Sequence, residues 1–228
     1  VCSSDLKFRV FYVDTIRDVI PFVGLYGIHL LYAITFGNNI FRGHSFGCRT
    51  LNHCVFEMSE PIGSTFYAAI SDDVCRRSGR MHYPVLPHIV YLDVPPDDKR
   101  RTLHETLRIP SDAVVFGRYG GMDSFDIDFV KETIQNVVQR RSNIYFLFAS
   151  TIPFIRHPRV IFIGKLVTDE EKCCLIDTCD AMIHGRLRGE TFGLAVAEFN
   201  FLNKPVITYH GSRERQHIVN LEIGRAHV

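Results

Sequence analysis

The sequence predicts an α/β protein whose second half is a doubly wound, parallel-sheet domain. Short runs that are apolar at every position alternate there with stretches of helical spacing, and such strands are typical of parallel sheets covered by helices on both faces. The proline- and charge-rich segment 93–100 is typical of a linker. We therefore expect one nearly complete Rossmann-like domain at 94–221 and the truncated end of another α/β domain at 7–93.

The first half contains fewer clear elements. We expect strands at about 8–13 and 84–92 and, within the apolar segment 20–36, a helix and a strand of the core. That segment is short for a membrane span and contains Pro21 and Gly24. The alternative is a membrane-surface element, which would make the protein membrane-peripheral.

The second half has a separate signal for each element. Thr102 and Glu105 indicate the cap of a short helix, and the apolar residues of 128–140 fall on one side of a helix. Thr168 and Glu171 form a capping box for a helix that ends near residue 178. The remaining expected elements are strands at 113–117, 144–148, 160–164, 181–184 and 205–209, and a helix at about 193–202.

The two ends of the chain look like translated DNA rather than protein. Residues 222–228 back-translate to GAG ATC GGA AGA GCA CAC GTC, most of which is the reverse complement of GTG TGC TCT TCC GAT CT from residues 1–6. This nucleotide sequence resembles a sequencing-library adapter. We expect residues 1–6 and 222–228 to lie outside the fold, as an artefact flanking a fragment without its true termini.

Composition indicates an ordinary soluble globular protein, with 46% hydrophobic and 22% charged residues. The net charge of +1 gives no electrostatic reason to expect a nucleic-acid partner. Of the seven cysteines, Cys2 lies in the suspect first segment, and the others have no C-x-x-C spacing. Reduced thiols in a cytoplasmic protein are the simplest interpretation.

The run 189–199 carries the most chemical information, because it follows a strand and opens a helix. In open α/β sheets ligands bind at the carboxyl ends of strands, and helix N-termini attract phosphate. Glu190 precedes the helix and Glu198 lies within it, a separation that suits two hydroxyl-bearing parts of one extended ligand. The amides expected to face a diphosphate belong to Phe192, Gly193 and Leu194, and Gly193 would let the backbone approach it closely.

This pair of glutamates, with seven residues between them that include Phe-Gly-Leu, resembles the signature of retaining GT-B glycosyltransferases of family four. Further segments match the family in order: Phe116-Gly117-Arg118, Asp180-Ala181-Met182-Ile183, Lys204-Pro205-Val206-Ile207 and, less distinctively, Ile70-Ser71 with Pro87-His88-Ile89-Val90. The resemblance covers about residues 51–212 and implies a GT-B fold.

The resemblance also implies a role for each matching residue. Glu190 would hydrogen-bond the donor sugar, and Glu198 would accept bonds from the ribose hydroxyls. Arg118 would pair with the diphosphate, which a guanidinium fork fits, and His53 would face the donor sugar. Positive charge and backbone amides would stabilise the leaving group, so no metal and no other cofactor is expected.

Two departures from the family's pattern stand out. The lysine usual after Gly-Arg is missing from 119–124, where Arg186 or Arg188 could substitute, and the usual Asn-Gly is replaced by His88-Ile89. We expect transfer of a hexose from a nucleotide diphosphate sugar to an unknown glycan, lipid or protein acceptor, with retention. The alternatives are a GT-B sugar-nucleotide epimerase or hydrolase, and a non-catalytic sugar-nucleotide-binding module.

Overall fold

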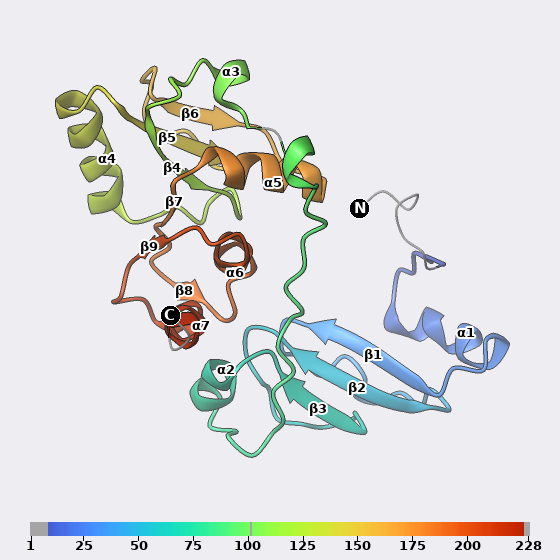
Figure 1. Cartoon of the computed structure of the whole chain (residues 1–228). Helices are drawn as coiled ribbons and strands as arrows, with labels where there is room; N and C mark the ends of the chain where they lie inside the picture. Colours follow the sequence, from blue (N-terminus) through green and yellow to red (C-terminus); the bar gives the residue numbers. More distant parts are fainter. Residues whose placement is uncertain (1–8, 101, 226–228) are drawn as a thin grey trace. The chain divides into compact units, whose positions relative to one another are not determined.

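The computed structural model describes residues 9–100 and 102–225, with side chains described up to residue 222 (Figure 1). Two compact units are present, and the division falls between His88 and Ile89. Residues 1–6 and 226–228 of the suspected adapter segments lie outside the described residues. Residues 222–225 continue the last helix, α7 (Gln216–Arg225), so the adapter hypothesis stays a prediction.

The first unit contains a three-stranded parallel sheet with the order β1-β2-β3. Its strands are β1 (Leu30–Thr35), β2 (Arg49–Cys54) and β3 (Phe66–Ala69). The short helices η2 (Ile16–Val19) and α1 (Ile20–Leu25) precede the sheet, and α2 (Asp72–Arg77) follows it. Ser71 caps α2, because its hydroxyl accepts a hydrogen bond from the amide of Val74.

The apolar segment 20–36 forms a helix and a strand as expected, but it is not the core segment that was expected. Val23 is the buried residue of α1. β1 is an edge strand, and its alternate side chains Leu30, Tyr32 and Ile34 are 45–59% exposed. Within the described residues, no helix is both long and apolar enough to cross a bilayer.

Two expected strands of the first half are wrong. Residues 9–13 form no strand, and Phe8 lies outside the described residues. The segment 84–92 makes a single parallel bridge, between Val85 and Ala69. Pro84 and Pro87 cannot donate the backbone hydrogen bonds that a longer ladder needs, which explains why this apolar stretch stays irregular.

The second unit is built on a five-stranded parallel sheet with the order β6-β5-β4-β7-β9. Its strands are β4 (Val114–Arg118), β5 (Ile144–Ala149), β6 (Val160–Ile163), β7 (Ala181–His184) and β9 (Val206–Thr208). Numbered along the chain, these strands have the order 3-2-1-4-5, which is that of a Rossmann sheet. The order reverses between β4 and β7, and this switch point is where such sheets bind ligands.

Helices cover both faces of this sheet, as the sequence predicted (Figure 1). Along β5, Leu147 and Ala149 join a core with α5 (Asp169–Thr178) and α6 (Leu194–Phe201), while Phe146 and Phe148 join a second core with α4 (Asp128–Arg140). Alternate residues of a strand point to opposite faces, so the continuously apolar sequence of β5 serves two cores.

Two cap predictions had different outcomes. The capping box of α5 is confirmed: Thr168 Oγ1 accepts from the Glu171 amide, and the Glu171 carboxylate accepts from the Thr168 amide, at 3.1 and 3.0 Å. The cap expected from Thr102 and Glu105 is wrong. Helix α3 (His104–Leu107) has Leu103 at its N-cap without a side-chain cap, and the Leu103 amide donates to Thr178 Oγ1 instead.

Candidate functional site

The candidate site lies at the switch point of the second unit. Arg118 is the last residue of β4, and His184 is the last residue of the neighbouring strand β7. After β7 the chain crosses a loop and forms β8 (Gly189–Glu190), which pairs with β10 (Glu214–Arg215). Glu190 and helix α6 are therefore placed beside the carboxyl ends of β4 and β7.

Arg118 is buried, with 3% of its surface exposed. One terminal nitrogen donates to Thr151 Oγ1 at 2.5 Å. The other donates to Ser124 Oγ at 2.6 Å and to the carbonyl of Gly121 at 3.1 Å. Its guanidinium carbon also lies 5.4 Å from the ring centre of Phe125, within cation–π range. The loops after β4 and β5 thus hold the guanidinium in one orientation.

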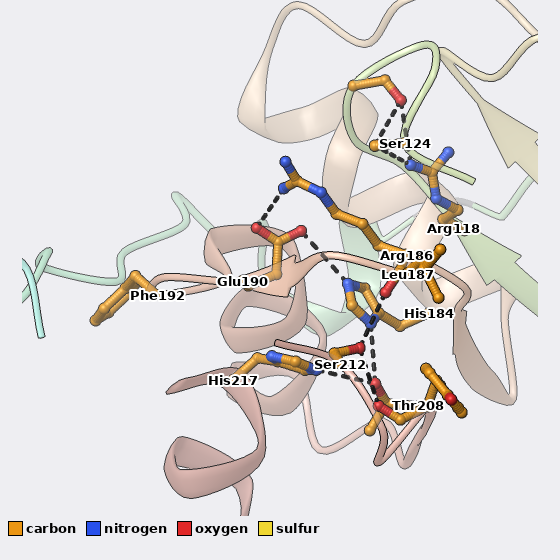
Figure 2. Close-up of polar contacts among 12 residues, drawn as sticks. Arg118, Ser124, His184, Arg186, Leu187, Glu190, Phe192, Thr208, Ser212 and His217 are labelled. Atoms are coloured by element: carbon orange, nitrogen blue, oxygen red, sulfur yellow. Dashed lines mark hydrogen bonds and ion pairs between the residues drawn. The ribbon is translucent and has the colours of Figure 1, made fainter. Parts of the chain in front are cut away.

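Glu190 lies between two donors from the segment that precedes it (Figure 2). The Arg186 guanidinium donates to Oε2 at 2.7 Å, and Nε2 of His184 lies 3.4 Å from Oε1. Burial acts to raise the pKa of Glu190, but these two partners outweigh it and hold the pKa below its ordinary value. Glu190 is therefore an ionised carboxylate near neutral pH.

Arg118 and Glu190 also influence each other. Burial lowers the pKa of the Arg118 guanidinium to about 10, and the nearby Glu190 carboxylate opposes this effect. The side chain of Arg186 is near enough to act in the other direction. The carboxylates of Asp126 and Asp123 also act on Arg118. Two guanidinium groups therefore share this edge of the sheet with several carboxylates, and the guanidinium groups are the side chains suited to an anionic ligand.

Glu198 has its own partners. It is 7% exposed, and it accepts hydrogen bonds from the Tyr119 hydroxyl at 2.5 Å and from Lys172 Nζ at 2.8 Å. Burial and the Glu198 charge raise the pKa of Tyr119, so the phenol stays a donor. Burial acts to lower the pKa of Lys172, but the contact with Glu198 outweighs it and raises that pKa.

None of these hydrogen-bond partners is shared by the two glutamates. They are nevertheless linked through adjacent residues at the end of β4, because Arg118 lies in the field of Glu190 while Tyr119 bonds Glu198. Arg118, Glu190 and Glu198 thus surround the same end of β4. Their contact with a ligand stays a prediction.

The start of α6 matches the expected position, but the reason for its glycine differs. Gly193 is the N-cap, Leu194 is the first helical residue and Phe192 is buried. Gly193 has φ +86°, and a Cβ there would lie 2.9 Å from His217 Cβ and 3.3 Å from Glu190 Cβ. The glycine is therefore required by the protein's own packing, whether or not a ligand also approaches it.

His53 belongs to the first unit, in β2, where it is 2% exposed. Its Nδ1 lies 2.5 Å from the Tyr32 hydroxyl, and its ring centre is 6.0 Å from that of His88. Burial, followed by the proximity of His88, lowers the pKa of His53, which favours the neutral imidazole. These contacts fix the ring, and its role toward a donor sugar stays a prediction.

The two arginines considered as substitutes for the missing lysine have different surroundings. Arg186 contacts Glu190, whereas Arg188 donates to Glu214 of β10 at 2.8 Å. Because Arg186 also lies in the field of Arg118, it is the arginine that the structure brings to the site.

Sequence reasoning missed three side chains of the site: Tyr119, Lys172 and His184. Tyr119 and Glu198 are 79 residues apart in the chain, and Lys172 and Glu198 are 26 apart. A signal was present for two of them. Tyr119 directly follows the Gly-Arg pair, and His184 ends the strand before the Glu190 motif, so both lie at the ligand-binding edge of the sheet.

A cavity of about 430 Å³ lies between α4 and the sheet, and it is not this site. His184 and Thr208 belong to its wall, but most of the lining is apolar, including Phe129, Ile134 and Ile207. Among the described residues its wall contains no Asp, Glu, Lys or Arg. The charged side chains at the Arg118–Glu190 edge therefore suit a charged ligand better than this apolar cavity does.

Comparisons with known proteins agree with the fold. No protein-family model matches the sequence, and no curated protein matches it either. The glycosyltransferase from Rickettsia africae ESF-5 aligns with a TM-score of 0.63 and 14% identity, over 88% of this chain and 62% of that one. HepE from Anabaena, in complex with UDP-glucose, aligns with a TM-score of 0.56 and 14% identity, over 92% and 72%.

Sucrose-phosphate synthase from Thermosynechococcus elongatus aligns with a TM-score of 0.52 and 14% identity, over 84% of this chain and 58% of that one. At such identities the likeness concerns the fold alone. It establishes that the chain has a Rossmann-like α/β architecture of the GT-B kind. The chain spans 62% of the length of the Rickettsia protein.

Proposed function

We propose that this chain binds a nucleotide diphosphate sugar and belongs to a glycosyltransferase that moves a hexose to an acceptor hydroxyl. The observation that carries this proposal is the pair of separate carboxylates, each held by its own donors, around one end of β4. A nucleotide sugar offers hydroxyls at two distant places with a diphosphate between them. Glu198, Glu190 and the two guanidinium groups match those three parts in kind.

In this proposal Glu198 accepts hydrogen bonds from the ribose hydroxyls. Tyr119 and Lys172 already occupy one lone pair on each carboxylate oxygen, and each oxygen can still accept another bond. Arg118 and Arg186 bind the diphosphate together with the amides that begin α6, so Arg186 takes the place of the lysine that the family pattern has elsewhere. Glu190 accepts hydrogen bonds from the hexose.

The transfer breaks the bond between the anomeric carbon and the diphosphate oxygen, and forms one from the acceptor oxygen to that carbon. The acceptor hydroxyl loses its proton, and the diphosphate leaves with added negative charge. Fixed guanidinium groups and amides stabilise that charge without reorganising, so we propose a metal-independent reaction. Retention of the anomeric configuration and a sugar contact by His53 belong to the same proposal.

The test is an incubation of the purified chain with labelled nucleotide sugars, starting with UDP-glucose, and with glycan, lipid and protein acceptors. Label on an acceptor supports transfer, provided that Glu190→Gln abolishes it. Free hexose or a changed donor sugar would instead identify a hydrolase or an epimerase. Binding without any change in the donor would identify a binding module, and no binding of any nucleotide sugar would contradict the proposal.

A further inference from the structure

Glu190 is connected through His184 to polar groups deeper in the second unit (Figure 2). Nδ1 of His184 lies 2.9 Å from Thr208 Oγ1, and Thr208 Oγ1 lies 3.1 Å from Nε2 of His217. The chain of contacts therefore runs from Glu190 in β8 through the ends of β7 and β9 to α7. The imidazole rings of His184 and His217 have centres 4.7 Å apart.

The two histidines of this hydrogen-bonded series are buried, and His217, the residue furthest from Glu190, is the more deeply buried. His184 is 6% exposed, and His217 is 0% exposed. Burial of polar rings is unfavourable unless they are hydrogen-bonded, and apolar residues of similar size would fill these places without that cost. Both rings contact the Thr208 hydroxyl, which apolar residues could not do as hydrogen-bond partners.

The proton positions follow from the chemistry of the partners. Thr208 has one hydroxyl proton, so it donates to one of the two imidazoles and accepts from the other. Either arrangement leaves Nε2 of His184 facing Glu190, whose carboxylate can only accept. Nε2 must then carry a proton, in the neutral ring and in the charged ring alike. His184 Nε2 thus donates to Glu190 whether or not the ring is charged.

Gly193 supplies a separate geometric observation. A Cβ at this glycine would contact the Cβ atoms of both Glu190 and His217, at 3.3 and 2.9 Å. The two ends of the hydrogen-bonded chain therefore pack against the same point at the start of α6. A movement of His217 would therefore displace Glu190 by two routes, through the hydrogen bonds and through the packing at Gly193.

We propose that His184 is a positioning residue for Glu190, and that Thr208 and His217 hold the His184 ring in the orientation that bonds the carboxylate. This inference rests on the proposed function for its consequence, which is that Glu190 is fixed at the place where the donor hexose binds. Arg186 is partly exposed and contributes a positive charge beside Glu190. His184 is buried, so its donor Nε2 stays in one place and orients the carboxylate.

The experiment compares His184→Gln with His184→Asn. The amide nitrogen of glutamine reaches about the place of Nε2 and can still donate to Glu190, whereas that of asparagine reaches about the place of Nδ1 and cannot. Thr208→Val removes the link behind the ring without changing side-chain shape. The first measurement is a carbon-13 NMR titration of the Glu190 carboxyl, assigned by its absence in Glu190→Gln, and it needs no ligand.

We expect the Glu190 titration to move to higher pH in His184→Asn, and to a smaller extent in Thr208→Val and in His184→Gln, because glutamine keeps the hydrogen bond but not the charge of the imidazole. A hydrogen bond to a charged group favours the ionised form, and glutamine keeps that bond. The same titration in His184→Asn as in the unaltered chain would overturn the proposal. If His184→Asn does not fold, as judged by circular dichroism, the Glu190 titration of Thr208→Val is compared with that of the unaltered chain. An unchanged titration in Thr208→Val would then overturn the proposal.

The second measurement is calorimetry with UDP and UDP-glucose. We expect His184→Asn to lose about tenfold in affinity for UDP-glucose, the loss of one hydrogen bond to a charged group, with UDP affinity unchanged. Equal losses for both ligands would overturn the positioning role. If the unaltered chain binds neither ligand, the proposed function fails, and the NMR titration still decides the role of His184.

Discussion

Replacement of Glu198 by glutamine tests how the nucleotide is recognised. The Glu198 carboxylate is 7% exposed and is already oriented by Tyr119 and Lys172, so little ordering remains when a ribose binds. Glutamine keeps the size but removes the charge, and one of its two terminal atoms becomes a donor. A hydrogen bond to a charged group contributes about 1.5–3 kcal/mol, so we expect UDP affinity to fall about ten- to a hundredfold.

Calorimetric titration of UDP into the purified chain measures this loss, and Glu190→Gln is the matched control. We expect Glu190→Gln to leave UDP affinity nearly unchanged, because UDP has no hexose for that carboxylate to contact. Its effect should appear with UDP-glucose instead. Unfolding midpoints of both variants would show that each is folded at the assay temperature. Equal loss of UDP affinity in the two variants would refute the separate roles given to the two glutamates.

Three further predictions follow from individual contacts. Gly193→Ala should destabilise the second unit by about 1–3 kcal/mol in urea unfolding, because φ is +86° and the new Cβ would meet His217; an unchanged midpoint would contradict the packing argument. Arg118→Lys should weaken UDP binding by about tenfold or more, since an ammonium cannot replace a held guanidinium fork, and UDP affinity equal to that of the unaltered chain would speak against the role. Glu190 contributes stability above its ordinary pKa of 4.5 that is lost as pH falls through its lower folded-state pKa. Thermal unfolding of Glu190→Gln should therefore depend less steeply on pH in acid, and identical pH profiles would refute this.

Local signals in the sequence were sufficient for most of the second unit. The apolar spacing on one side of the helix predicted the bounds of α4 that the structure has, and the Thr168–Glu171 capping box predicted the start of α5. The fully apolar run of β5 correctly indicated a strand with a core on each face. These features depend on residues a few positions apart, so a single sequence contains them.

Features that depend on distant partners were not predictable in the same way. The apolar segment 84–92 looked like a strand, but a strand needs a ladder partner, and only one bridge forms. Arg118 lies at the end of β4 and Glu198 in α6, close to where the sequence placed them. Glu190 was expected in a loop, but it belongs to the short strand β8, which needs the distant partner β10.

Glu190 is oriented by His184 and Arg186 from the segment just before it. The partners of Glu198 come from distant parts of the chain, as when Lys172 of α5 reaches Glu198 of α6, and no local pattern encodes such a contact.

We propose that a nucleotide sugar binds at the carboxyl ends of β4 and β7. An NMR titration of the labelled chain with UDP-glucose tests it most directly, because backbone amides report where the ligand lies. We predict saturable shifts centred on Arg118, Glu190 and the start of α6 at Leu194, with little change in the amides of Phe129 and Ile134 beside the apolar cavity. Shifts centred on that cavity, or no shifts at millimolar UDP-glucose, would rule out nucleotide-sugar binding at this edge of the sheet.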